Sequence, residues 1–115
     1  KDQGNYKLLS KIFSKEKEVI ISTEFPSWFE NGIKTLYCVP KYPTDFNEID
    51  FMALKLYYGY SNHCKDMRAL FKAAEMGVKM IEIHVTSSYE KPFIDNPVSF
   101  DFNDLGDIIS TLKKL

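Results

Sequence analysis

The chain has 115 residues, and its 15 basic and 16 acidic side chains give a formal net charge of −1. This length allows one domain, and without a basic excess we expect no nucleic-acid partner. The longest apolar runs are far too short to span a bilayer, so we expect no membrane partner either. Two cysteines, Cys38 and Cys64, build no disulfide framework and favour a reducing, cytoplasmic setting.

Helical and extended patterns alternate along the chain. Asn5 and Asp101 are typical residues at the start of a helix, and Gly77 is typical of a helix end. The strands are apolar runs without polar alternation, as expected for parallel strands covered on both faces. In chain order, the predicted elements are a helix from residue 5, a strand at 18–22, a helical turn at 26–32, a strand at 35–39, a brief helix at 46–56, a strand at 57–61, a helix at 66–76, a strand at 79–85 and a helix at 102–115.

Helices that alternate with apolar strands predict an α/β fold, with a parallel sheet of βα repeats and right-handed crossovers. Four strands fit either a small doubly wound sheet or half of a (β/α)8 barrel, whose units average about 31 residues. The predicted strand starts at Val19, Leu36, Tyr58 and Met80 are only 17, 22 and 22 residues apart. The units are therefore compressed, and the helices that cover the sheet must be short.

Chemistry in a parallel α/β sheet collects at the carboxyl ends of the strands. Both histidines of the chain, His63 and His84, fall at the ends of adjacent predicted strands, 21 residues apart. Neutral imidazoles that converge from neighbouring strands suit a divalent transition metal. The alternative is that each histidine is an ordinary polar residue at a strand end, because two ligands do not make a complete site.

Several motifs are similar to those of one enzyme family. Residues 59–63 read Gly-Tyr-Ser-Asn-His, residues 80–86 read Met-Ile-Glu-Ile-His-Val-Thr, and residues 92–95 read Pro-Phe-Ile-Asp. Their order and spacing resemble the N-acetylneuraminate (sialic acid) synthase family, with weaker matches at residues 22–23 and 42–44. The resemblance implies that residues 1–115 form a single partial barrel domain, corresponding to strands five to eight of the synthase (β/α)8 barrel.

Enzymes of this family condense phosphoenolpyruvate with an N-acylated amino sugar and release phosphate. The resemblance implies that His63 and His84 hold a divalent metal, manganese, that polarises the sugar aldehyde, and that Glu82 is the third catalytic residue. Each candidate could singly be a capping, packing or solvated residue, but the ordered set favours an active site. The substrate contacts carried over residue by residue are serine donors to phosphoenolpyruvate (Ser22, Ser61), a tyrosine wall (Tyr42) and carboxylate acceptors for sugar hydroxyls (Glu82, Asp95).

The chain departs from the family pattern at five positions, which bear on the identity of the amino sugar. The residues that differ are Glu24 for glycine, Pro40 for a polar residue, Asn62 for aspartate, Ile83 for lysine and Asn96 for histidine.

The sequence is compatible with three functions. The first is half of a synthase barrel, whose amino-terminal half would carry the glutamate base and the lysines that neutralise phosphoenolpyruvate. The second is a non-catalytic half-barrel that acts as a binding or assembly domain. The third is an unrelated flavodoxin-like binding module, but residues 22–26 lack the glycine-rich phosphate loop that such a module requires.

A half-barrel would leave open edges at the strands 18–22 and 79–85, and an apolar inner face carrying residues such as Ile20, Tyr58 or Ile81. Exposure of such side chains to water costs about 25 cal/mol per Å². We therefore expect the chain to pair with an amino-terminal half-barrel, to form a homodimer, or to fill its own open face with aromatic side chains. The candidates for that filling are Trp28, Phe93 and Phe100.

Overall fold

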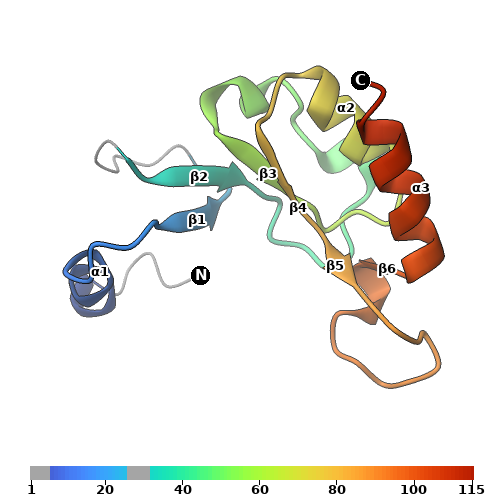
Figure 1. Ribbon diagram of the computed structural model, residues 1–115, viewed down its shortest axis with the longest axis horizontal. Helices are drawn as coiled ribbons and strands as arrows, with labels where there is room; N and C mark the ends of the chain where they lie inside the picture. Colours follow the sequence, from blue (N-terminus) through green and yellow to red (C-terminus); the bar gives the residue numbers. More distant parts are fainter. Residues whose placement is uncertain (1–5, 26–31) are drawn as a thin grey trace.

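The computed structural model describes residues 6–25 and 32–115, with the backbone alone at Tyr6. The chain forms a four-stranded parallel sheet of β1 (Ile20–Thr23), β2 (Lys34–Tyr37), β3 (Gly59–Ser61) and β4 (Met80–Glu82). The strands lie side by side in chain order, as Figure 1 shows. The predicted α/β fold with four parallel strands is confirmed, although every strand is shorter than its apolar run.

Three helices accompany the sheet: α1 (Tyr6–Phe13), α2 (Arg68–Glu75) and α3 (Phe102–Leu112). The helices α2 and α3 pack against each other at the β4 end, whereas α1 lies at the opposite end of the molecule (Figure 1). The predicted cap of α3 is confirmed, because the Asp101 carboxylate accepts a 2.8 Å hydrogen bond from the Asp104 amide. Gly77 follows α2 with a φ of +89°, a conformation that favours glycine. The predicted cap Asn5 and the helical turn at 26–32, including Trp28, fall almost wholly outside the described residues.

The single helix predicted at 46–56 is wrong. Two 3₁₀ turns replace it, η1 (Phe46–Glu48) and η2 (Ala53–Leu56). The Asp50 carboxylate accepts hydrogen bonds from the amides of Met52 and Ala53, and so starts a second turn instead of continuing the first.

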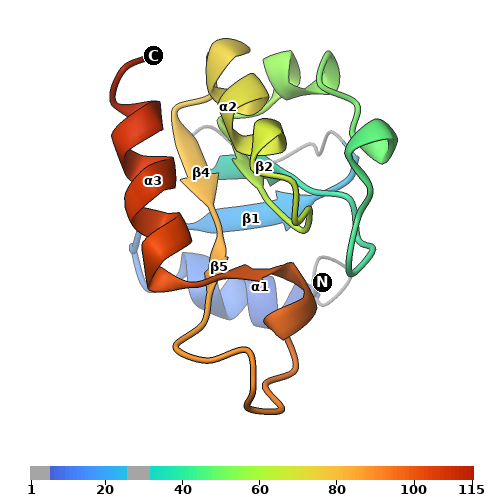
Figure 2. The same cartoon turned by 90° about the vertical axis from the view of Figure 1, so that its right-hand side faces the viewer.

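The strand predicted at 79–85 is divided. Its end forms β5 (His84–Val85), which pairs in parallel with β6 (Ser99–Phe100), a strand that the sequence analysis did not predict. The connection is a long loop that extends away from the sheet and ends in the 3₁₀ turn η3 (Asn96–Val98), as seen in Figure 2. The expected open edge at 79–85 is therefore paired over its last two residues.

The core lies on the helix-covered face of the sheet, where tyrosines of β2 and β3 meet α2 and α3. Ile81 packs on this face and not on the inner one, which corrects the expectation for that residue. Phe100 is buried as expected, but on the helix side, whereas Phe93 is 48% exposed and does not line the main cavity on the inner face. The buried members of the core are Tyr37, Ile49, Phe51, Leu54, Tyr57, Tyr60, Cys64, Ala69, Leu70, Ala73, Phe100 and Ile108.

The opposite face of the sheet carries Ser22, Cys38, Ser61 and Glu82 at its carboxyl edge, and Leu36, two positions before Cys38, is buried on the same face. Ile20, at the β1 edge, is 45% exposed, as expected for the open inner face of a half-barrel. None of the described helices combines the length and apolarity needed to cross a membrane.

Candidate active site

Alternate residues of the strands point to the inner face, as side chains in extended backbone must. At the carboxyl edge of the sheet they surround a cavity of about 700 Å³. All seven site residues predicted from the sequence line it, so the structure brings the whole set together. The lining residues are Ser22, Cys38, Pro40, Tyr42, Ser61, His63, Glu82, His84, Ile94, Asp95, Pro97 and Val98.

The two histidines face each other across this cavity, with ring centroids 5.7 Å apart. His63 is buried, and its Nδ1 lies 2.6 Å from the Val39 carbonyl oxygen. Because a carbonyl can only accept, Nδ1 carries the proton and Nε2 carries the lone pair. Burial lowers the pKa of His63, against the opposing effect of the Val39 hydrogen bond, so the neutral ring is favoured.

The Nε2 atom of His84 lies 4.0 Å from a carboxylate oxygen of Asp95, the residue that directly precedes η3. Its Nδ1 is buried and has no hydrogen-bond partner among the described residues. The accessible nitrogen of His84 is therefore Nε2, the same atom that holds the lone pair in His63.

Tyr42 forms an aromatic wall beside the two imidazoles. Its ring centroid lies 4.0 Å from that of His63 at an interplanar angle of 30°, and 6.3 Å from that of His84 at 81°. Partial burial raises the pKa of the Tyr42 hydroxyl, which therefore stays protonated and able to donate.

Ser61 and Glu82 are joined across β3 and β4. They occupy paired positions in the sheet, and the Ser61 hydroxyl donates a 2.6 Å hydrogen bond to a Glu82 carboxylate oxygen. The serine is buried, so this bond holds the carboxylate at the cavity wall.

The five residues that depart from the family pattern lie in different places relative to the cavity. Ile83 packs toward the helix-covered core, so loss of the family lysine there removes no group from the cavity. Glu24 is exposed and does not line the cavity. Asn96 donates to the carbonyls of Ser88 and Lys91 and holds the loop between β5 and β6, leaving Pro40 as the departure that lines the main cavity.

Asn62 also points away from the cavity and is fully buried. Its amide oxygen accepts from the Tyr60 hydroxyl at 2.9 Å and from the Cys64 amide at 3.2 Å. Its amide nitrogen donates to the Cys64 carbonyl at 2.7 Å. An asparagine fits here because the site needs both a donor and an acceptor, and it fixes the turn that follows His63.

Sequence reasoning missed several lining residues. Cys38 could have been found, because it lies two positions after Leu36 on the inner face of its strand. Ile94, Pro97 and Val98 come from an irregular loop, where no periodic pattern predicts which side chains face the cavity.

The donor set suits a divalent transition metal in part. The Nε2 atoms of His63 and His84 are available as ligands, and the backbone hydrogen bond that orients His63 is typical of a metal-binding histidine. Within residues 6–25 and 32–115, no group of three or more His, Cys, Asp or Glu side chains is arranged to hold a metal. Further ligands would therefore be water, substrate or residues outside the described part.

A parallel α/β sheet whose strand ends present imidazoles, hydroxyls and carboxylates to one cavity has the arrangement of the carboxyl face of a βα barrel, here with four of its strands. The chain matches the NeuB family over residues 1–115 and belongs to it.

Among curated proteins, the chain is 26% identical over 133 residues to an N,N'-diacetyllegionaminic acid synthase of Campylobacter jejuni, which covers 96% of this chain and 40% of that protein. It is 26% identical over 128 residues to an uncharacterized protein of Methanocaldococcus jannaschii, covering 94% of this chain and 38% of that protein. The chain thus spans about two fifths of the length of these relatives.

Among solved structures, the fold matches an N-acetylneuraminic acid (sialic acid) synthetase of Leptospira borgpetersenii serovar Hardjo-bovis in complex with citrate. The TM-score is 0.84 at 20% sequence identity, over 98% of this chain and 46% of that chain. This likeness supports the fold, with a neighbour of the TIM-barrel type.

Proposed function

We propose that this chain supplies half of the catalytic barrel of a synthase that condenses phosphoenolpyruvate with an N-acylated amino sugar to make a nonulosonic acid. The observation that carries the proposal is the gathering of Ser22, Tyr42, Ser61, His63, Glu82, His84 and Asp95 around one cavity. Family membership over the whole chain supports it. The two free cysteines agree with a reducing, cytoplasmic setting.

In this reaction the phosphoenolpyruvate methylene carbon bonds to the aldehyde carbon of the sugar, water adds to the phosphoenolpyruvate C2, and the C2–phosphate oxygen bond is lost with release of phosphate. Ser22 donates to phosphoenolpyruvate, and Ser61 does so when its hydroxyl turns from the Glu82 carboxylate to the substrate, while Glu82 and Asp95 accept from sugar hydroxyls and orient the aldehyde. His63 and His84 are the residues that would hold a manganese ion. Such an ion supplies Lewis-acid polarisation of the aldehyde.

The charge of the cavity indicates that this chain acts together with another part. None of the described residues that line it is a lysine or an arginine, and two of them, Glu82 and Asp95, are carboxylates. Phosphoenolpyruvate carries about three negative charges at neutral pH, and such an anion needs cationic or hydrogen-bonding partners when it leaves water. We infer that an amino-terminal half-barrel, or a second copy of the chain, completes the site.

The alternative, a non-catalytic binding or assembly domain, is less well supported. Such a domain would need the sheet and its core, but it would not need imidazoles, serines and carboxylates on the same side of the sheet. Their convergence favours the enzyme.

The test uses the natural protein that contains this chain. Phosphate release is measured with phosphoenolpyruvate, Mn²⁺ and either N-acetylmannosamine or a diacylated amino sugar. We expect His63→Ala and His84→Ala to abolish turnover, and Asn103→Ala, an exposed position on α3, to leave it unchanged. Undiminished phosphate release from either histidine variant would remove that residue from the reaction.

A further inference from the structure

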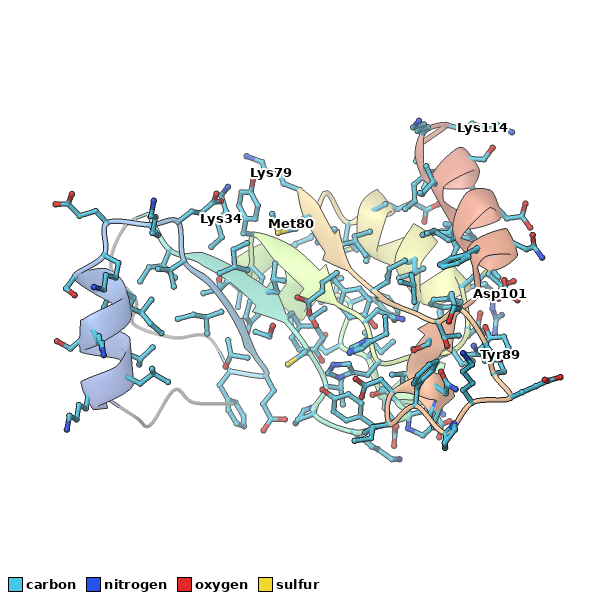
Figure 3. All side chains as sticks on the ribbon, turned by 60° about the horizontal axis from the view of Figure 1, so that its bottom comes forward. Lys34, Lys79, Met80, Tyr89, Asp101 and Lys114 are labelled. Atoms are coloured by element: carbon cyan, nitrogen blue, oxygen red, sulfur yellow. The ribbon has the colours of Figure 1, made fainter. Side chains whose placement is uncertain are left out.

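A cluster outside the cavity joins the loop after β3 to the loop between β5 and β6. The Lys65 ammonium donates hydrogen bonds to the Ser99 carbonyl and, at 2.9 Å, to the Tyr89 hydroxyl. The same ammonium lies 4.3 Å from the ring centroid of Tyr89 and 5.1 Å from that of Phe100. Figure 3 shows Tyr89 at the end of the molecule where α3 begins, near Asp101.

Ser99 connects this cluster to the cavity. It is 2% exposed and is paired with His84 in the β5–β6 register. Its hydroxyl donates a 2.7 Å hydrogen bond to the carbonyl of Asp95, and its own carbonyl accepts from Lys65. One residue therefore contacts the backbone of the carboxylate and of the imidazole that face each other in the site.

The Tyr89 hydroxyl strengthens this connection. It lies 3.2 Å from the Ser99 carbonyl oxygen and 3.3 Å from an Asp104 carboxylate oxygen, and its hydrogen can be donated to either one. Through Tyr89, the loop between β5 and β6 is therefore in contact with both β6 and α3.

The tip of the loop has little burial to hold it. Phe93 is 48% exposed and Ile94 is 94% exposed, so apolar packing does not fix the segment that carries Asp95. Hydrogen bonds and the cation–π contacts of Lys65 must supply the order instead, and each is individually modest.

We propose that Lys65, Tyr89 and Ser99 form a clamp that positions Asp95 against His84, with Lys65 as its key positioning residue. The inference rests on the proposed function, because it assigns the clamp to the amino-sugar side of the site. Lys65 lies two positions after His63, so the clamp also ties the loop to the segment that carries the other histidine. The residues that bind phosphoenolpyruvate in the proposed function, Ser22 on β1 and Ser61 on β3, are not members of the clamp.

This division predicts a selective defect. A shift of about 1 Å in a substrate-positioning group costs up to about 100-fold in rate, so loss of the clamp should weaken use of the sugar strongly. We expect Lys65→Ala to raise KM for the amino sugar about tenfold or more and to leave KM for phosphoenolpyruvate within about twofold. Lys65→Arg keeps the donors and the cation–π contacts and should restore most of the loss.

The experiment compares Lys65→Ala, Lys65→Arg, Tyr89→Phe and the control Lys91→Ala in the natural protein that contains this chain. Lys91 lies in the same loop and is exposed. Both KM values are measured, together with amide hydrogen exchange of residues 86–98 and of α2. The clamp predicts faster exchange at 86–98 alone in Lys65→Ala, a smaller change in Tyr89→Phe, and wild-type behaviour in Lys91→Ala.

Equal rises in both KM values, or unchanged exchange at 86–98 in Lys65→Ala, would overturn the clamp. Failure of the proposed function is a separate result, seen as absence of condensation by the wild-type protein. In that case exchange decides alone: faster exchange confined to 86–98 supports the clamp, and unchanged exchange rejects it.

Discussion

Gly59 lies where the sheet leaves no room for a side chain. A Cβ atom at this position would lie 2.3 Å from the Met80 carbonyl oxygen and 2.6 Å from the Leu36 Cδ2 atom. Ordinary contacts of this kind begin near about 3.5 Å, so Gly59→Ala requires β3 and β4 to move apart by roughly 1 Å. The strands cannot yield easily, because Gly59 pairs with Met80 and, two residues on, Ser61 pairs with Glu82.

The expected cost follows from that geometry. Forcing an extra methyl group into a packed site costs about 1–3 kcal/mol, to which weakening of the Ser61–Glu82 hydrogen bond adds about 1 kcal/mol. Gly59→Ala should therefore lower the free energy of unfolding by about 2–4 kcal/mol, measured by urea denaturation followed by circular dichroism. In a synthase it should also reduce turnover, since Ser61 and Glu82 are displaced together.

Gly106→Ala is the matched control. It lies inside α3, and a Cβ atom there would meet nothing within 4 Å. Alanine in a helix interior is favoured over glycine, so this variant should gain about 0.5–1 kcal/mol. If Gly59→Ala is as stable as the wild type while Gly106→Ala gains stability, the close approach of β3 and β4 is not real, and the reasoning fails.

Three further predictions concern the site and its support. Asn62→Asp should lower the free energy of unfolding by about 2–3 kcal/mol at about pH 8 and by less at about pH 5, because burial favours the protonated acid; urea titrations at both pH values, with exposed Asn47→Asp as control, check this. Mn²⁺ should raise the melting temperature of the natural protein, and His63→Ala or His84→Ala should remove that shift; an unchanged shift in both variants would exclude the pair as ligands. Residues 1–115 purified alone should bind no phosphoenolpyruvate in calorimetry and catalyse no condensation, since the described cavity lining holds no cation; binding at micromolar phosphoenolpyruvate would contradict this.

The sequence by itself determined the elements whose signals are local. The helix α2 is set by its periodic apolar positions and the glycine that follows it, and α3 by its cap Asp101. The strands were recognisable as apolar runs, and their alternation with helices implied a parallel sheet. Because carboxyl ends of parallel strands meet at one edge, the sequence alone predicts that the residues after those runs lie in one site.

Tertiary structure alone decided which face of the sheet each strand residue occupies and that β5 pairs with β6. Glu82 and His84 line the inner cavity, and Ile81, which alternates with them along the chain, therefore faces the helices. The sequence does not reveal which of the two faces each residue takes, because the run has no clear alternation of polar and apolar residues. The β5–β6 pairing joins residues 15 positions apart through an irregular loop, and the contacts of Lys65 with Ser99 span 34 positions. Such contacts depend on where the backbone returns in space, which is set by packing of the whole domain and not by the residues beside each position.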